Sequence, residues 1–255
     1  MNTIIKFFIA LLLIIASGFV NNNQLNSSDN NATTQIILTT PEGEGILTEY
    51  IREVYLEVSK RTGIKFIIKE VPGERAIINA NNGTEDGVAM RLRGLEKEYS
   101  NLKIVDVSIL TVKHIIFANK REIIENGNDL QQLTEIIIKN NYLIGYIRGS
   151  VKAKKELDGF PDNCKVELSN PEQGLRMLDL DRIQAFLAGP GIITKNLLKT
   201  KFHTSKIKEA AVISEFPLYT YLHKKHNAII PELEKALQSM KDDGTLDKIR
   251  NTYEN

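Results

Sequence analysis

The sequence predicts an α/β fold made of two lobes, each a mainly parallel sheet flanked by helices. Short β-branched runs alternate with amphipathic helical segments along most of the chain, an order typical of parallel sheets with crossover helices. A polar stretch, residues 120–129, interrupts this alternation, and the same order then begins again. The length of 255 residues and the apolar content of 42% suit one or two packed lobes.

The first residues have the pattern of a secretory signal peptide. Lys6 supplies a positive charge, Phe7 to Ile15 are all apolar, and Ala16-Ser17-Gly18 offers small residues for cleavage. The alternative is a membrane anchor, but the uncharged apolar part has about ten residues and spanning a bilayer needs about 20. We therefore expect residues 1–18 to direct export and the Asn- and Ser-rich residues 19–34 to form a flexible lead-in.

The folded part opens with five elements that end in turn residues. Gly63 follows a helix whose apolar side chains recur at a period near 3.6, which is typical of a C-terminal cap. The expected elements are a strand at 35–40, a helix at 46–62, a strand at 64–71, a short helix at 74–82 and a strand at 87–90.

Two more strands, at 103–108 and 112–119, lead to the polar stretch at 120–129, the first candidate for a crossing between lobes. Beyond it the expected elements are a helix at 130–139, a strand at 142–147, a helix from 150, a strand at 165–168, a helix at 171–180, a strand at 183–188 and a helix after 190. The chain closes with a strand at 206–213, an apolar segment at 216–222 and helices at 231–241 and 246–253.

Charge and motifs exclude several classes of function. The 33 basic and 32 acidic residues are balanced, which argues against a nucleic-acid partner. Cys164 is the single cysteine, so no disulfide framework is possible. The sequence has no nucleophile elbow, phosphate loop, glycine fingerprint or structural-zinc spacing. We therefore expect a protein that is not an enzyme and holds no cofactor and no metal.

The histidines do not suggest a metal site either. His223 and His226 lie three apart in a stretch that we interpret as extended, which places them on opposite faces. His114 and His203 have no companion in the sequence.

Candidate ligand-binding residues follow the predicted strands, where open α/β sheets bind ligands. Arg91 and Arg93 follow the strand at 87–90, and a guanidinium there can hold an anionic group or simply be solvated. Arg75 begins a short helix after a strand, with an ion pair to Glu74 as the competing role.

Further candidates lie in two other turns. In Gly145-Tyr146-Ile147-Arg148-Gly149-Ser150 a strand leads to a helix start, so the Gly149 and Ser150 amides and the Ser150 hydroxyl can face a ligand, although Ser150 is also an ordinary N-cap. Glu42 and Glu44 can meet an ammonium group, or can serve as acids at a helix N-terminus. The aromatic candidates for stacking, each with burial in the core as the alternative, are Tyr146, Phe216 and Tyr219.

In their order and spacing these segments resemble the type II periplasmic solute-binding proteins, specifically the family-3 group associated with polar amino acid ABC transporters. The resemblance covers residues 35–253. It is carried by Pro72-Gly73-Glu74-Arg75-Ala76, by Asn81-Asn82-Gly83-Thr84-Glu85-Asp86-Gly87, by residues 102–108 and 145–150, by Tyr221-Leu222-His223-Lys224-Lys225-His226 and by Met240-Lys241-Asp242-Asp243-Gly244-Thr245-Leu246.

The resemblance implies two lobes joined by two crossovers, with C-terminal helices that return to the first lobe. We therefore expect residues 35–117 and 214–255 to form lobe 1 and residues 118–213 to form lobe 2. It also implies a periplasmic monomer that captures a small polar, anionic or zwitterionic, amino-acid-like molecule by hinge closure and delivers it to an ABC permease in the membrane. The alternatives are a sensory module that reports to a membrane receptor and a periplasmic enzyme on the same fold.

Two departures from the family concern the ligand. Members usually hold the carboxylate of an amino acid with an Arg at a place that falls here on or near Asn101. They usually hold the ammonium with an Asp at a place that falls near Gly189. Both charged residues are missing at these positions, which puts an ordinary amino acid ligand in doubt.

Overall fold

The computed structural model describes residues 35–42 and 45–254, which belong to one compact unit. The predicted signal peptide, the predicted lead-in and Glu44 lie outside the described residues. No helix within the described ranges is long and apolar enough to cross a membrane.

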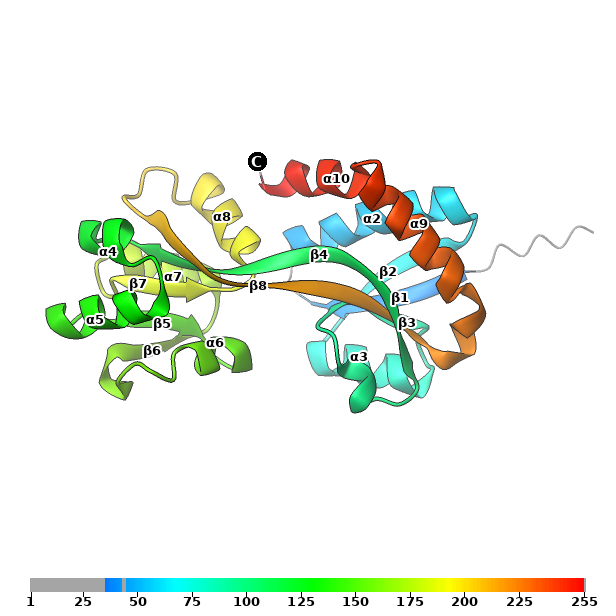
Figure 1. Ribbon diagram of the computed structural model, residues 1–255, viewed down its shortest axis with the longest axis horizontal. Helices are drawn as coiled ribbons and strands as arrows, with labels where there is room; N and C mark the ends of the chain where they lie inside the picture. Colours follow the sequence, from blue (N-terminus) through cyan, green and yellow to red (C-terminus); the bar gives the residue numbers. More distant parts are fainter. Residues whose placement is uncertain (1–34, 43–44, 255) are drawn as a thin grey trace, which may run out of the picture. The chain divides into compact units, whose positions relative to one another are not determined.

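One mixed sheet organises the described chain (Figure 1). Its strand order is β2-β1-β3-β8-β4-β7-β5-β6. The strands are β1 (Gln35–Pro41), β2 (Lys65–Val71), β3 (Gly87–Arg91), β4 (Leu102–Ala118), β5 (Ile144–Ile147), β6 (Lys165–Leu168), β7 (Ala185–Ala188) and β8 (Lys208–His223).

The two ends of the sheet are parallel and its middle is antiparallel. On one side β2, β1 and β3 pair in parallel, and on the other β6, β5 and β7 do the same. The long strands β4 and β8 run antiparallel to each other and join the two parallel groups. Each parallel group needs crossover helices to return the chain, which is why strands and helices alternate in the sequence.

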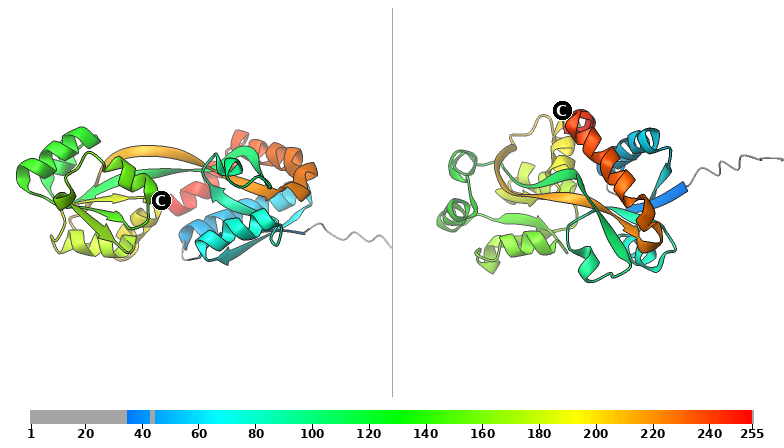
Figure 2. Two further views of the ribbon diagram at one scale, coloured as in Figure 1. Left: turned by 90° about the horizontal axis from the view of Figure 1, so that it is seen from below. Right: turned by 45° about the vertical axis from the view of Figure 1, so that its right-hand side comes forward.

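Helices cover both faces of each parallel group (Figures 1 and 2). They are α2 (Ile46–Thr62), α3 (Gly73–Asn82), α4 (Arg121–Asn126), α5 (Leu130–Asn140), α6 (Val151–Glu156), α7 (Pro171–Asp179), α8 (Gly191–Thr200), α9 (Ile230–Asp242) and α10 (Thr245–Glu254). Short 3-10 turns lie at Leu95–Lys97 (η1), Asp162–Cys164 (η2) and Lys224–Ile229 (η3). As predicted, α2 ends at Gly63, whose φ of 72° is left-handed and whose amide donates to the Ser59 carbonyl.

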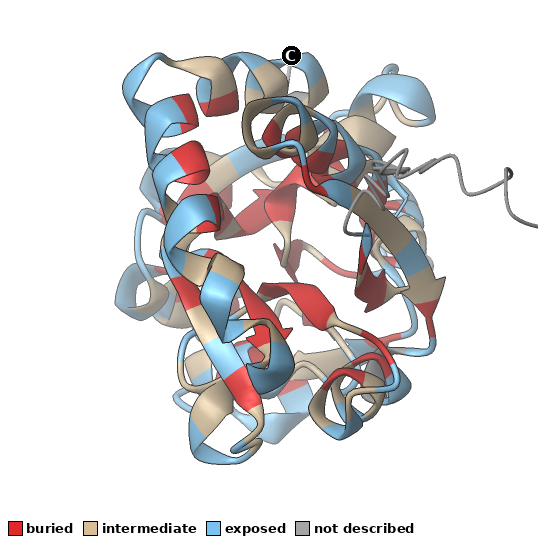
Figure 3. Cartoon of the chain, turned by 90° about the vertical axis from the view of Figure 1, so that its right-hand side faces the viewer, coloured by how far each residue is buried: buried red, intermediate tan, exposed pale blue. Residues whose placement is uncertain are grey.

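The core follows this layering, with buried residues on the strands and on the inner sides of the helices (Figure 3). In the first parallel group, α2, α9 and α10 cover one face and α3 covers the other. In the second, α4, α5 and α6 pack on one face and α7 and α8 on the other. Ile116 and Ala118 of β4 face the first of these layers, and Ile115 and Phe117 face the second, which is the two-residue period of a strand.

The sequence-based prediction was wrong about the long strands. It places two strands at 103–108 and 112–119, whereas β4 is continuous from Leu102 to Ala118. The sequence from 103 to 118 contains no Gly, Pro or Asn to end a strand, and Ile109 and Leu110 between the predicted strands are buried. Likewise β8 runs without a break from Lys208 to His223.

Two local predictions also differ. The polar stretch at 120–129 is not a crossing, because it contains α4, whose Ile123 is fully buried among α5 and β5 residues. The crossing is made by β4 itself. The segment after His223 is the 3-10 turn η3 and not a strand, and His226 there pairs with Asp86 at 2.6 Å.

Candidate functional site

The register of the long strands shows where the parallel strands end. Arg91, the last residue of β3, pairs with Tyr219 of β8, and Ala188, the last residue of β7, pairs with Ile115 of β4. Between these points Leu110–His114 pair in order with Leu218–Ser214, and we call these ten residues the crossing segment. The carboxyl ends of the strands in both parallel groups therefore lie beside the same short stretch of β4 and β8. Open α/β sheets bind ligands at such carboxyl ends.

Arg91 lies at the first of these edges. Its side chain is half-buried, and Nη1 donates to the carbonyl oxygens of Met90 at 3.2 Å and Ala89 at 3.5 Å. Met90 has a left-handed φ of 56°, unusual for a residue with a side chain, and the pairing with β8 is irregular between Val88 and Arg91. The strand is distorted where it delivers Arg91 to the edge.

Arg93 and Tyr219 pack against each other. The Arg93 guanidinium lies 4.5 Å from the centre of the Tyr219 ring and forms an ion pair with Asp106. Its hydrogen bond holds the pKa of the Asp106 carboxyl below its usual value. One face of Tyr219 is thus covered by Arg93, and the buried Tyr219 also packs in the core beneath α3.

The remaining lobe 1 candidates are exposed. Arg75 lies in the first turn of α3, and Glu42 lies in the turn after β1, where its amide donates to the Val71 carbonyl at 3.0 Å. The side chain of Glu74, the alternative partner of Arg75, is outside the described part of the chain.

The turn after β5 serves mainly to begin α6. The Ser150 hydroxyl accepts from the Ala153 amide at 3.3 Å, which is the capping role that the sequence allows. The Ser150 amide donates to the Ile147 carbonyl at 3.1 Å, so it is engaged within the turn and does not point outward as expected. Gly149 adopts a φ of 80°, a left-handed conformation that favours glycine at this position.

Two more candidates face β6. Arg148 forms an exposed ion pair with Glu167 at 3.3 Å, and the Tyr146 hydroxyl donates to the same carboxylate at 3.0 Å. Tyr146 is buried in the core of lobe 2, as its alternative interpretation proposed.

A polar cluster joins His114 and Ser214 of the crossing segment to Glu156 and Lys152 of α6, and sequence reasoning missed it. His114 Nδ1 lies 2.5 Å from Glu156 Oε2, and the side chains are only 6% and 8% exposed. The Ser214 hydroxyl donates to Glu156 Oε1 at 2.5 Å, and the Lys152 ammonium lies 3.1 Å from the same oxygen.

The cluster keeps Glu156 ionised. Burial by itself raises the pKa of this carboxyl. The hydrogen bonds from Ser214 and His114, with the nearby Lys152 ammonium, outweigh burial, so the pKa of Glu156 lies below its usual value. Since an ionised carboxylate only accepts hydrogen bonds, His114 Nδ1 carries the hydrogen of the shared bond.

Gly189 lies directly against the His114 ring. A Cβ at position 189 would overlap His114 Cδ2 and Nε2, so no side chain fits there while the ring keeps its place. The Phe216 ring also packs on His114 in a T-shaped contact, with ring centres 5.0 Å apart and planes at 80°. An Asp at position 189 would therefore clash with the His114 ring.

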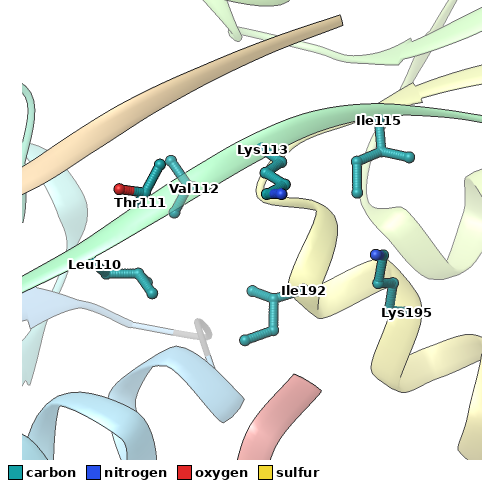
Figure 4. A pocket seen from close by; sticks show the side chains of 7 residues that line it. All are labelled: Leu110, Thr111, Val112, Lys113, Ile115, Ile192 and Lys195. Atoms are coloured by element: carbon teal, nitrogen blue, oxygen red, sulfur yellow. The ribbon is translucent and has the colours of Figure 1, made fainter. Parts of the chain in front are cut away.

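A small pocket opens beside the crossing segment on the side of α8 (Figure 4). Its cavity volume is about 20 Å³, and its lining residues are Leu110, Thr111, Val112, Lys113, Ile115, Ile192 and Lys195. Both lysines are paired, Lys113 with Glu215 at 3.0 Å and Lys195 with Glu209 at 2.7 Å. Among the described residues, no group of three or more His, Cys, Asp or Glu side chains could hold a metal ion.

Comparison with known proteins identifies the fold. No protein-family model matches the sequence. The L-cystine-binding protein TcyA of Bacillus subtilis is 26% identical over 208 residues, which cover 80% of this chain and 71% of TcyA. The probable amino-acid ABC transporter extracellular-binding protein YtmK of Bacillus subtilis superposes with a TM-score of 0.68 at 20% identity, covering 87% of this chain and 98% of YtmK.

A third similarity places the fold inside a larger protein. The VFT2 domain of Bordetella pertussis BvgS superposes with a TM-score of 0.63 at 16% identity, covering 86% of this chain and 93% of the domain. In the whole BvgS periplasmic domain the match covers 43% of that chain. This chain therefore has the two-lobed α/β fold of the type II periplasmic binding proteins, as the sequence predicts.

Proposed function

We propose that this chain is an extracytoplasmic solute-binding protein that captures a small polar, anionic or zwitterionic molecule by hinge closure and delivers it to an ABC permease. The observation that carries the proposal is the register: the carboxyl edges of the two parallel groups face each other along the crossing segment. The match to TcyA and the fold of YtmK support a solute of the amino acid type.

The span between the edges makes hinge closure part of the proposal. From Leu110, next to the end of β3, to Ile115, opposite the end of β7, an extended strand advances roughly 17 Å. A small solute contacts both edges only if bending of β4 and β8 brings them together. The pairing of these strands is irregular between Val105 and Leu110 and again between His114 and Ile115, which provides a place to bend at each end of the crossing segment.

In this proposal the division at residues 117/118 and 213/214 separates the moving bodies. The core clusters support two such bodies, because residues of α2, α3, α9 and α10 pack with β1, β2 and β3, while residues of α4 to α7 pack with β5 and β7. On β4 the change falls slightly earlier than residue 117, since Ile115, Ile116 and Phe117 pack with the second group. Arg91 stands at the edge of lobe 1 and contributes a positive charge to the ligand site, and closure strengthens its attraction to an anion by removing water.

A thermal-shift screen tests the proposal. Amino acids, small carboxylates, polyamines and short peptides are each added at millimolar concentration, and a solute at 100 times its Kd stabilises the folded protein by about 2.7 kcal/mol. For a chain of this size that raises Tm by roughly 5–11 °C. Small-angle scattering with the best solute is expected to show a smaller radius of gyration. If no solute in the panel raises Tm, the proposal is wrong for these classes.

The BvgS similarity favours a second candidate, a binding module that reports to a membrane receptor, because there the fold is one part of a larger periplasmic chain. The ligand site would be the same. Loss of solute uptake in a strain lacking the chain supports the transport role, whereas normal uptake with a lost transcriptional response to the solute supports the receptor role.

A further inference from the structure

A hydrogen bond fixes the His114 ring through one of its two nitrogens. Its Nδ1 is bound to Glu156 Oε2, and Glu156 is anchored in turn by Ser214 on β8 and Lys152 on α6. The Glu156 carboxylate thus binds two side chains that lie opposite each other on β4 and β8, because His114 and Ser214 are register partners. The ring has a defined orientation, and Nε2 is its second polar atom.

Nε2 lies beside the backbone of Gly189, just after the end of β7. No hydrogen bond joins Nε2 to another described residue. It is also not one of the fully buried polar atoms without a partner, which in the described part of the chain are Thr48 Oγ1, Asn119 Oδ1 and Thr194 Oγ1. Solvent therefore reaches Nε2, although the residue as a whole is only 5% exposed. A buried ring that is tightly oriented and opens to solvent through one nitrogen is suited to meet a ligand.

The hydrogen-bonding groups of the cluster indicate which kind of ligand group Nε2 would bind. Both Glu156 oxygens are already used, Oε2 by His114 and Oε1 by Ser214 and Lys152, so the cluster offers no carboxylate oxygen to an ammonium group. What it offers is the imidazole nitrogen and the remaining hydrogens of the Lys152 ammonium, which is 45% exposed. Since Nδ1 donates to Glu156, Nε2 accepts in the neutral ring and donates only in an imidazolium, which would lie between the Glu156 carboxylate and a bound anion.

Resting on the proposed function, we propose that His114, oriented by Glu156, is the residue of the crossing segment beside the end of β7 that binds the solute, and that as an imidazolium it donates from Nε2 to an anionic group such as a carboxylate. Lys152 adds positive charge beside this group. Arg91 on the opposite edge would then hold a second acceptor, so the solute carries an anionic group at the end that enters lobe 2.

The test observes the wild-type ring directly. Imidazole nitrogen resonances of the 15N-labelled protein are recorded by NMR while succinate, glutarate, citrate, L-aspartate and L-glutamate are added, and His114→Gln assigns the His114 signals. The expected result is that at least one of these carboxylates binds and shifts the His114 Nε2 resonance towards the protonated form. Diamides of the same acids are expected to bind at least tenfold more weakly.

Variants supply the second measurement, by calorimetry with the best carboxylate. His114→Gln is expected to weaken binding at least tenfold, while His203→Gln, at an exposed position in the loop after α8, leaves Kd unchanged within threefold. Glu156→Gln frees the ring and is expected to weaken binding while the His114 signal moves towards that of an unconstrained imidazole. The NMR experiment measures binding on the wild-type protein, and if His114→Gln does not fold, Gln variants of the other three histidines assign the His114 signals by elimination.

Two results overturn the inference. If a carboxylate binds and the Nε2 resonance of His114 stays where it was, His114 is not a ligand residue, and the proposed solute-binding function stands. If none of the carboxylates binds, the anionic class is wrong, and the proposed function then depends on the remaining solutes of the screen.

Discussion

Replacing Glu156 by Gln removes one negative charge from the cluster with almost no change in volume. The carboxylate is 8% exposed and accepts from His114, Ser214 and Lys152. Breaking a buried ion pair by removing one partner typically costs 3–5 kcal/mol, and the amide can still form part of the hydrogen bonding, so we expect a loss of about 3 kcal/mol. For a chain of this size that is a fall in Tm of roughly 6–12 °C.

The effect has a pH signature whose sign follows from the lowered pKa of Glu156. A carboxyl with a lowered pKa in the folded state stabilises the protein above its unfolded value, and this stabilisation disappears as pH falls through the folded value. The stability difference between wild type and Glu156→Gln is therefore expected to be complete at pH 7 and to shrink below the ordinary value of 4.5.

Urea unfolding of both proteins from pH 7 to pH 3 measures this difference. Glu209→Gln on β8 is the matched control, because the Glu209 side chain is 38% exposed and an exposed ion pair such as that with Lys195 is worth about 0–1 kcal/mol. A cost for Glu156→Gln equal to that of the control, or a difference that does not change with pH, would refute a stabilising role for the buried carboxylate.

Three further predictions concern single contacts. Gly189→Ala places a Cβ inside the rigid His114 ring and is expected to cost about 1–3 kcal/mol in thermal unfolding, whatever its effect on binding. Tyr55→Phe removes a buried hydroxyl that donates to Thr220 Oγ1 at 2.5 Å and is expected to cost about 1–2 kcal/mol by urea unfolding. Arg91→Ala is expected to weaken binding of an anionic solute at least tenfold by calorimetry, the effect of losing one charge-assisted hydrogen bond.

Each of these predictions has a control in the same chain. Gly159→Ala meets no atom within 4 Å and tests whether the Gly189 effect is steric. A double-mutant cycle with Thr220→Val isolates the Tyr55 hydrogen bond, and a coupling energy near zero would exclude it. Arg121→Ala, 85% exposed on α4, should leave solute affinity unchanged, and an equal loss in both arginine variants would remove Arg91 from the site.

Most elements of the fold could be predicted because their signals are local. The apolar side chains of α2 recur at helical spacing, as predicted, and those of Leu47, Tyr50, Ile51, Val54, Tyr55 and Val58 are buried. β6 coincides with the predicted strand at 165–168. The long strands were divided wrongly, since continuity across Ile109 and Leu110 depends on burial by α10 and α2, far away in the sequence.

The site was only partly predictable, for the same reason. Strand ends are visible in the sequence, so Arg91 could be placed at the edge that faces the crossing segment. Nothing in the sequence joins His114 to Glu156, which lies 42 positions later, or Glu156 to Ser214, 58 positions after that. Their contact requires β4, α6 and β8 to meet, which only the sheet order β8-β4-β7 brings about.

Two positions that are far apart in the sequence, 114 and 189, are in contact in the structure. Position 189 has no carboxylate, and His114 has no companion in the sequence. In space the ring of His114 fills the volume that a side chain at 189 would need, and the negative charge of this region is instead supplied by Glu156, behind the ring. In the proposed site a ligand at the end of β7 meets Nε2 of an imidazole that is backed by a carboxylate, and not a carboxylate on residue 189 itself. Because the ring and a side chain at 189 compete for the same volume, a substitution at 189 and one at 114 cannot be judged independently.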